Sequence, residues 1–290
     1  MWSKTFSQES GFPFSNQSLV SINPSFAGSN GGIRNQSTWY YTQFPHTSSG
    51  RLTINNTFDS YIKPLRGSLA VSYGHDDLLK GLIKTNFFST AYAQHFSLYN
   101  NRLKLTPSLK FSYIDKSLDY IRIYGAKQLV SHRKTSYLGT GLLLNYKALH
   151  LGVSVLGINL NRSGVITSKQ SSPDYNLYLS YNKKVSEKTL FQVSMIAYSE
   201  SLSSYTQLNF NALFFKHLMC GVTYLSYHDF NSGNLMFNTG YRSNFYAATL
   251  GYNNLYGVLS PYVLGSWTAT FSFNLRNKEL RKELTNFENW

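Results

Sequence analysis

The chain has 290 residues, of which 16% are aromatic and only 14% charged, whereas soluble domains carry about 25% charged residues. No apolar run approaches the roughly 20 residues of a membrane helix, which argues against a helical membrane protein. The formal charge is +14, but Lys and Arg are scattered singly without a basic helix, zinc signature or RNA-binding motif. We therefore expect no nucleic-acid partner, and the composition fits an outer-membrane β-barrel.

Residues 1–32 show no alternation and are expected to form an irregular N-terminal lead-in. The stretch INPSFAGSNGG, residues 22–32, carries turn signals, because Pro24 biases Asn23 away from helix and Gly28 permits turns that other residues resist. Two placements remain open. The lead-in runs along the periplasmic rim of the barrel, or it folds into the lumen as a partial plug.

Alternation of apolar and polar residues dominates residues 33–276, and this period is typical of strands with one apolar and one polar face. We expect about 14 strands of roughly 9 to 14 residues, a number and length suited to a transmembrane antiparallel β-barrel. The predicted strands are 33–44, 51–62, 66–76, 83–98, 102–113, 136–147, 149–158, 174–185, 188–199, 206–215, 217–228, 233–242, 245–256 and 267–275.

The connections between these strands differ in length by parity. Every second connection is short, such as 63–65 and 243–244, whereas the others include the longer loops 115–135, 159–173 and 257–264. Outer-membrane barrels place short turns on the periplasmic side and longer loops outside. We therefore expect an outer-membrane barrel with both termini in the periplasm.

The two faces of the predicted strands differ in kind. One face carries Leu, Phe, Tyr, Val and Ile, whereas the other carries Ser, Thr, Asn and Gly with isolated cations. A cation facing lipid near the middle of the bilayer costs about 2–4 kcal/mol, so the cations are expected to point inward. The candidates for a basic lumen are Lys104, Lys110, Lys147 and Arg242. The alternative places some of them at strand ends, where they reach the membrane interface.

Residues 277–290 break the strand pattern and are expected to form a short periplasmic tail. Leu280, Leu284 and Phe287 share one face at helical spacing, with charged residues around them. Either a short amphipathic helix or a disordered tail accounts for this pattern.

Motifs of catalysis, cofactor binding and metal binding are missing from the sequence. It contains no Gly-flanked nucleophile with an ordered His and Asp, no HExxH, no CxxC, no P-loop and no GxGxxG that opens a helix. His75, Asp76 and Asp77 adjoin a predicted loop and are interpreted as a solvated polar turn instead of a metal site. We expect a non-catalytic protein without a cofactor.

Several segments together resemble the PorP/SprF proteins of the type IX secretion system in Bacteroidota. FSQ at residues 6–8 and INPSFAGS at 22–29 are similar to that family's FSQ and NPAxAGS elements, and YYTQFP at 40–45 is similar to its YRNQWP. GLLLNYKALHLGVSVLGIN resembles the family's central hairpin, and GSWTATFSFNL at 265–275 its closing strand. The residues at the motif positions are Asn23, Pro24, Ala27, Gly28, Gln43, Phe44, Pro45, Gly265 and Ser266, of which Phe44 replaces the family's Trp.

The resemblance implies an outer-membrane barrel that works with the type IX machinery. Its partners would be a secreted cell-surface adhesin or other cargo, periplasmic or outer-membrane type IX components, and membrane lipid and lipopolysaccharide. Such a barrel docks, helps to export or anchors a large cell-surface protein such as a gliding adhesin. The alternative function is a porin-like channel whose basic lumen admits anionic solutes.

Overall fold

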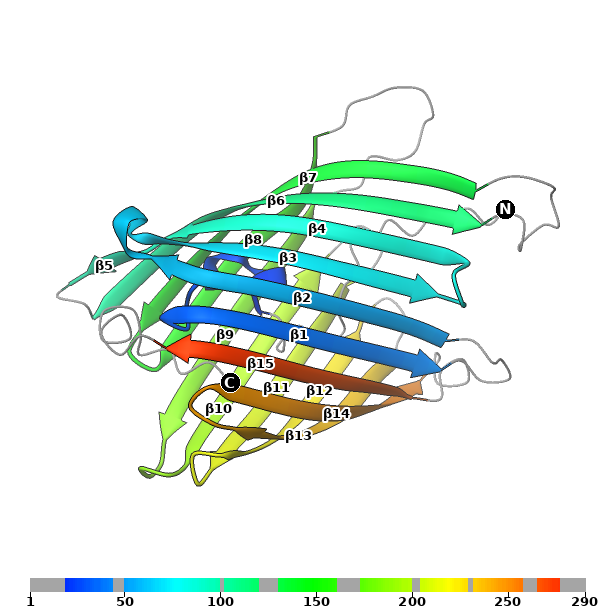
Figure 1. Cartoon of the computed structure of the whole chain (residues 1–290). Coiled ribbons are helices and arrows are strands. Elements are labelled where there is room, and N and C mark those ends of the chain that lie inside the picture. The colour runs from blue at the N-terminus through cyan, green and yellow to red at the C-terminus, as the bar shows by residue number, and fades with distance from the viewer. Residues whose placement is uncertain are drawn as a thin grey trace.

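Strands account for most of the chain in the computed structural model, and they form one antiparallel sheet that closes into a barrel (Figure 1). The structure describes residues 19–43, 50–99, 102–119, 130–160, 173–199, 204–228, 232–257 and 265–276. The strands are β1 (Gly32–Gln43), β2 (Gly50–Ile62), β3 (Gly67–Leu78), β4 (Ile83–Gln94), β5 (Phe96–Leu98), β6 (Leu103–Asp119), β7 (Val130–Tyr146), β8 (Leu149–Asn159), β9 (Asp174–Lys184), β10 (Leu190–Ser199), β11 (Ser204–Phe214), β12 (Leu218–Tyr227), β13 (Ser232–Arg242), β14 (Tyr246–Gly257) and β15 (Ser266–Arg276). The described helical turns are α1 (Leu19–Ile22), η2 (Pro24–Phe26) and η3 (Lys63–Leu65).

The barrel closes through its first and last strands. β1 and β15 pair in an antiparallel ladder that runs from Gly32 opposite Arg276 to Thr42 opposite Ser266. β4 and β5 both pair with β6 and are two parts of one barrel strand, so fifteen strand segments make fourteen barrel strands. The predicted all-β transmembrane barrel of about 14 strands is confirmed.

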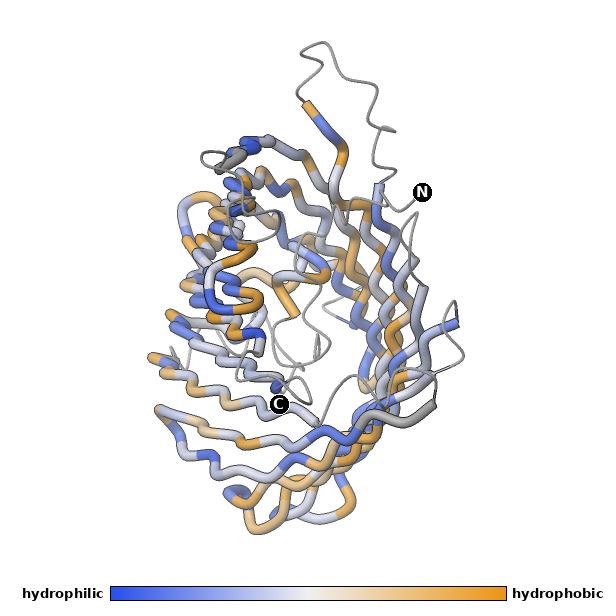
Figure 2. The backbone as a smooth tube through the Cα atoms, turned by 90° about the vertical axis from the view of Figure 1, so that its right-hand side faces the viewer, coloured by the Kyte–Doolittle hydropathy of each residue, from blue (hydrophilic) through white to orange (hydrophobic). Residues whose placement is uncertain are grey.

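The two faces of the wall follow the alternation of the sequence, which is visible as alternating colour along the strands in Figure 2. On β15, Trp267 is 58% exposed on the outer face, while its neighbour Thr268 is 2% exposed on the inner face. Inner polar groups bond to one another across strands. Asn209 Nδ2, for example, donates to Ser194 Oγ at 3.0 Å, and Thr223 Oγ1 donates to Asn209 Oδ1 at 2.9 Å. The barrel therefore presents an apolar surface to lipid and a hydrogen-bonded polar surface to the lumen.

The predicted loop 115–135 is shorter in the structure. β6 and β7 are each 17 residues long and pair as far as Asp119 opposite Val130, so most of the predicted loop 115–135 is strand. Charged residues end the apolar alternation there without ending the ladder.

The interpretation of His75 and Asp76 as part of a solvated turn is also wrong, because both lie within β3. Arg51 donates to Asp76 through Nε at 2.7 Å and Nη2 at 3.1 Å, and Asn86 Oδ1 lies 2.7 Å from His75 Nδ1. These cross-strand partners keep the polar residues in the sheet.

At one end of the barrel every connection is five residues long or shorter, and we call this end the short-turn rim. Its connections are residues 63–66, 99–102, 147–148, 185–189, 215–217 and 243–245. β1 begins and β15 ends at this rim, with Gly32 opposite Arg276. The predicted tail 277–290 and residues 1–18 of the lead-in lie outside the described residues.

No described helix is long and apolar enough to cross a membrane.

Candidate functional site

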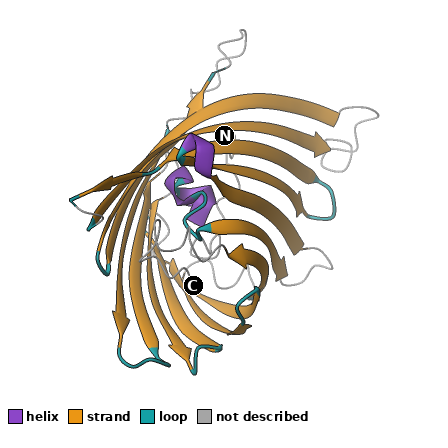
Figure 3. Cartoon of the chain, turned by 60° about the vertical axis from the view of Figure 1, so that its left-hand side comes forward, coloured by secondary structure: helices purple, strands orange, loops and turns teal. Residues whose placement is uncertain are grey.

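A segment of the lead-in, residues 19–31, lies inside the barrel (Figures 1 and 3), and we call it the plug segment. Asn23 fixes its central turn. Its Oδ1 accepts from Ser25 N at 3.0 Å, and its Nδ2 donates to the carbonyl oxygens of Leu142 at 3.3 Å and Val153 at 3.2 Å. Pro24 follows at the first position of η2, where its missing N–H costs nothing. One Asn side chain therefore caps the 3₁₀ turn and ties it to β7 and β8.

Two glycines of the wall make room for the Asn23 side chain. A Cβ at Gly141 of β7 would lie 2.2 Å from Asn23 Oδ1, and a Cβ at Gly152 of β8 would lie 3.0 Å from Asn23 Nδ2. Both glycines belong to the hairpin of residues 141–159, whose sequence resembles the central hairpin of PorP/SprF proteins. The plug segment and this hairpin are therefore complementary in shape.

The other end of the plug segment is held by a buried ion pair. Gly28 N donates to Asp59 Oδ2 at 2.7 Å, while Arg34 Nε donates to Asp59 Oδ1, also at 2.7 Å. Asp59 is 0% exposed and Arg34 is 8% exposed. Gly28 has φ +64°, and a Cβ there would lie 1.9 Å from Ser68 Oγ, so this position needs glycine both for its backbone and for space.

Apolar packing joins these two anchor points. Phe26 and Ala27 are both fully buried, and the Phe26 ring meets that of Tyr178 edge-on with 5.0 Å between centroids. The plug residues share one buried cluster with small wall residues, and its wall members include Ala70, Ala91 and Ala93. Small side chains on β3 and β4 let the plug backbone approach the wall closely.

Hydrogen bonds to further strands also hold the plug segment in place. Ile22 O accepts from Ser154 Oγ of β8 at 2.7 Å, Ser25 Oγ lies 2.8 Å from Ser108 Oγ of β6, and Asn30 Nδ2 donates to Asn274 Oδ1 of β15 at 2.6 Å. The plug segment thus bonds to strands on several sides of the lumen.

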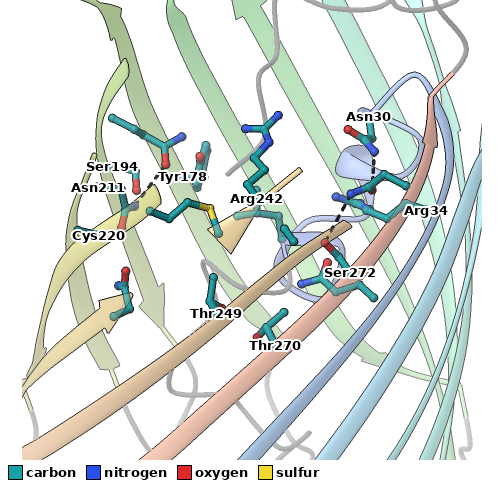
Figure 4. A pocket seen from close by; sticks show the side chains of 17 residues that line it. Asn30, Arg34, Tyr178, Ser194, Asn211, Cys220, Arg242, Thr249, Thr270 and Ser272 are labelled. Carbon is teal, nitrogen blue, oxygen red and sulfur yellow. Dashed lines mark hydrogen bonds between the residues drawn. The ribbon is translucent and has the colours of Figure 1, made fainter. Parts of the chain in front are cut away.

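A cavity of about 100 Å³ lies between the plug segment and the wall formed by β9 to β15 and β1 (Figure 4). Amides and hydroxyls dominate its polar lining, with guanidinium groups at Arg34 and Arg242. Among the described residues, no group of three or more His, Cys, Asp or Glu side chains is placed to hold a metal ion. The amides and hydroxyls of the cavity can offer hydrogen bonds, and its guanidinium groups can contact an anion.

Three of the four candidates for a basic lumen lie on inward-facing positions. Lys110 is buried on β6, and its Nζ reaches Ser21 O of the plug segment at 3.5 Å. Lys104 shares that face of β6 nearer the short-turn rim, and Arg242 is buried at the rim end of β13. Lys147 differs, because it lies exposed in the turn between β7 and β8, with its Nζ 5.4 Å from the centroid of the Tyr146 ring. Lys147 has φ 51° in this turn, so it is not part of the strand alternation that points the other three side chains inward.

The remaining motif residues lie away from the plug. Gln43 is exposed at the end of β1, and Phe44 and Pro45 lie outside the described residues. Gly265 precedes β15 with φ +131°, and a Cβ there would lie 2.8 Å from Tyr252 Oη. Ser266 Oγ accepts from Asn253 Nδ2 at 3.0 Å. These two residues fix the start of the strand that closes the barrel.

Sequence reasoning missed Arg34 and Asp59, the ion pair whose carboxylate accepts the amide of Gly28. A signal was present, since each is a lone charge on the polar face of a predicted strand. Only the register, with Arg34 opposite Asp59 on β1 and β2, makes them neighbours.

A row of tyrosines was also missed. Tyr198, Tyr205 and Tyr227 lie opposite one another on β10, β11 and β12, on the inward side near the rim opposite the short turns. The rings of Tyr198 and Tyr205 stack with 4.8 Å between centroids. The register of three strands brings these residues into one row, and the sequence does not show that register directly.

Solved structures share the fold at low sequence identity. Omp33 of Acinetobacter baumannii, an outer membrane protein, aligns with a TM-score of 0.52 and 11% identity, over 84% of this chain and 96% of that chain. The KdgM porin aligns with a TM-score of 0.41 and 7% identity, over 83% of this chain and 99% of that chain. The first likeness supports the barrel fold, and the second carries no argument about function. No curated protein matches the chain.

A family described as "Type IX secretion system membrane protein PorP/SprF" matches residues 8–276. The match includes the plug segment, the central hairpin and the closing strand, whose geometry is described above. The chain belongs to the PorP/SprF family of type IX secretion system membrane proteins, and its barrel fold fits an outer-membrane location.

Proposed function

We propose that this barrel is a non-catalytic docking component of the type IX system, which helps to export or anchors a large cell-surface protein such as a gliding adhesin. The observation that carries the proposal is the plug segment. It is tied to β7 and β8 through Asn23 and to β2 through Gly28 and Asp59. A lumen occupied by a segment that is bonded to several strands of the wall supports a docking role over free solute flow.

We further propose that the short-turn rim faces the periplasm. β1 begins and β15 ends at that rim, so both termini would be periplasmic, which agrees with the usual placing of short turns in outer-membrane barrels. The opposite rim would then face the cell surface. There the longer loops and the partly exposed rings of Tyr198 and Tyr227 offer a binding surface, since tyrosine is enriched in protein interfaces.

Affinity purification from native outer membrane tests this proposal. Barrel with a C-terminal tag should co-purify with a large secreted protein or with other type IX components. The double variant Tyr198→Ala/Tyr227→Ala should lower recovery of that cargo by about tenfold or more, as expected for aromatic anchors of an interface. The matched control Tyr99→Ala/Tyr146→Ala, which removes two tyrosines at the short-turn rim, should leave cargo recovery unchanged. Recovery of neither cargo nor secretion components with the wild-type barrel contradicts the docking function.

The alternative is a porin-like channel for anionic solutes, and one observation favours it. Lys110 and Arg242 are both buried on inward-facing positions, so the lumen carries positive charge. Planar bilayers separate the two functions. A porin shows steady, anion-selective conductance, whereas a plugged docking barrel shows little or none.

A further inference from the structure

Exposed cations gather at the short-turn rim. Five of its six turns carry at least one of them, either in the turn or at its edge. We call the following set the basic collar: Lys63, Arg66, Arg102, Lys147, Lys183 and Lys216. Within the described parts of these turns the single acidic residue is Glu187, which has Lys184 and Lys188 on either side.

The opposite rim is nearly balanced in charge. Its described cations are Arg51, Lys80, Lys84, Lys116, Arg133 and Lys134, and its described acids are Asp76, Asp77, Asp115, Asp119 and Asp174. Some of these charges pair directly, as Arg51 does with Asp76 at 2.7 Å. Among described residues, the positive charge of the protein is therefore concentrated at the short-turn rim.

Each part of the collar has an exposed apolar or aromatic neighbour. Leu65 is 52% exposed beside Arg66, Tyr99 is 86% exposed near Arg102, and Phe215 is 71% exposed beside Lys216. Tyr181 faces outward two residues before Lys183 on β9, and Lys147 lies over the Tyr146 ring. Aromatic rings at the level of the headgroups with cations next to them are typical of a membrane interface.

Several of these cationic and aromatic residues also have a strained, left-handed backbone conformation. Arg66, Tyr99, Lys147, Phe215 and Lys216 all have positive φ, between 46° and 66°. Asn or Gly takes these conformations at lower cost. Leu79 and Lys80 at the opposite rim share this strain, but at the short-turn rim it recurs in four turns. Large side chains are thus retained where the backbone favours small ones, which suggests that the side chains are used.

We infer that the basic collar binds the phosphate groups of anionic phospholipids in the leaflet that meets the short-turn rim. The collar is distributed around the barrel, so a continuous lipid leaflet contacts all of it, whereas a protein partner of ordinary size contacts one arc. Clustered Lys and Arg beside a membrane segment attract anionic lipid. This assignment concerns the short-turn rim and does not depend on what the opposite rim docks.

Native mass spectrometry of the full-length barrel tests the inference. The barrel is released from nanodiscs of mixed phosphatidylcholine and phosphatidylglycerol, and the retained lipids are counted. Wild type should retain phosphatidylglycerol in preference to phosphatidylcholine. The variant Arg66→Gln/Arg102→Gln/Lys147→Gln/Lys216→Gln should lower that preference by about fivefold or more. High salt during reconstitution should weaken the wild-type preference.

The matched control removes four exposed cations from the opposite rim, as Lys80→Gln/Lys84→Gln/Arg133→Gln/Lys134→Gln, and should keep the wild-type preference. Folding of each variant is checked by its heat-dependent migration on SDS gels. An unchanged preference in the collar variant overturns the inference, as does an equal loss in the control. If the collar variant instead loses an acidic periplasmic protein while lipid preference persists, the collar is a protein-binding surface and the lipid assignment is wrong.

Discussion

Arg34 and Asp59 form an ion pair inside the barrel, with 2.7 Å between Arg34 Nε and Asp59 Oδ1, and the second carboxylate oxygen accepts the amide of Gly28. The pair links β1 to β2 and both strands to the plug segment. A buried carboxylate needs several donors to offset its desolvation, and here the barrel wall and the plug each supply one. At this point the Asp59 side chain alone therefore joins the plug to two strands of the wall.

Replacement of that carboxylate should weaken the fold. Asp59→Asn leaves Arg34 buried without its counter-charge, and breaking a buried pair costs about 3–5 kcal/mol. We expect a loss of about 3 kcal/mol in the free energy of unfolding, measured by urea titration of the barrel in lipid vesicles. Glu187→Gln, which changes an exposed acid at the short-turn rim, should be neutral within about 0.5 kcal/mol. Equal stability of the two variants would contradict this role of the ion pair.

Gly28→Ala tests the close approach of the plug to the wall. The added Cβ would lie 1.9 Å from Ser68 Oγ, and alanine also disfavours φ +64° by about 1–2 kcal/mol. We expect the plug segment to be displaced, with a measurable rise in planar-bilayer conductance. Gly157→Ala is the matched control, because Gly157 has φ +73° but its Cβ would meet its nearest atom at an ordinary 3.6 Å. Similar conductance of both variants would show that the contact with Ser68 does not hold the plug.

A double-mutant cycle tests the close fit of the Asn23 side chain against Gly141. Gly141→Ala alone would place its Cβ 2.2 Å from Asn23 Oδ1, and such overpacking costs about 1–3 kcal/mol. In the Asn23→Ala background that clash is gone, so the two changes should couple by about 1 kcal/mol or more in unfolding free energy. Gly139→Ala serves as the control, since its Cβ would meet Leu156 instead and its effect should simply add to that of Asn23→Ala. If the effects of Gly141→Ala and Asn23→Ala on the unfolding free energy were also additive, Asn23 would not pack against Gly141 as described.

The sequence predicted the barrel well because its determinants are local. Alternation marks each strand, and turn length follows parity, so strand number and order needed no knowledge of long-range contacts. The errors occurred where charges entered the pattern. Asp115 and Lys116 were assigned to a loop although they pair with β7, because a charge near the end of a barrel strand looks the same in sequence as a loop charge.

The plug was predicted only as one of two placements, since its contacts are all long-range. The Asn23 side-chain amide donates hydrogen bonds to Leu142 and Val153, which lie 119 and 130 positions further along the chain. Nothing in INPSFAGS specifies these two partners. Glycines at 141 and 152 carry the complementary signal, but an isolated glycine in a strand has several explanations. The motif could be noticed from the sequence, whereas its physical reason required the fold.

The charge of the lumen can be measured once the plug is removed. A variant that lacks residues 1–31 should conduct ions, and inward Lys110 and Arg242 should make it prefer anions. Lys110→Gln/Arg242→Gln in that background should shift the reversal potential under a KCl gradient toward cation selectivity, because a pore lined by fewer cations attracts fewer anions. Lys147→Gln should leave the reversal potential unchanged, since Lys147 lies exposed in a turn. An equal shift from Lys147→Gln, or none from the lumen pair, would contradict the placement of positive charge at Lys110 and Arg242.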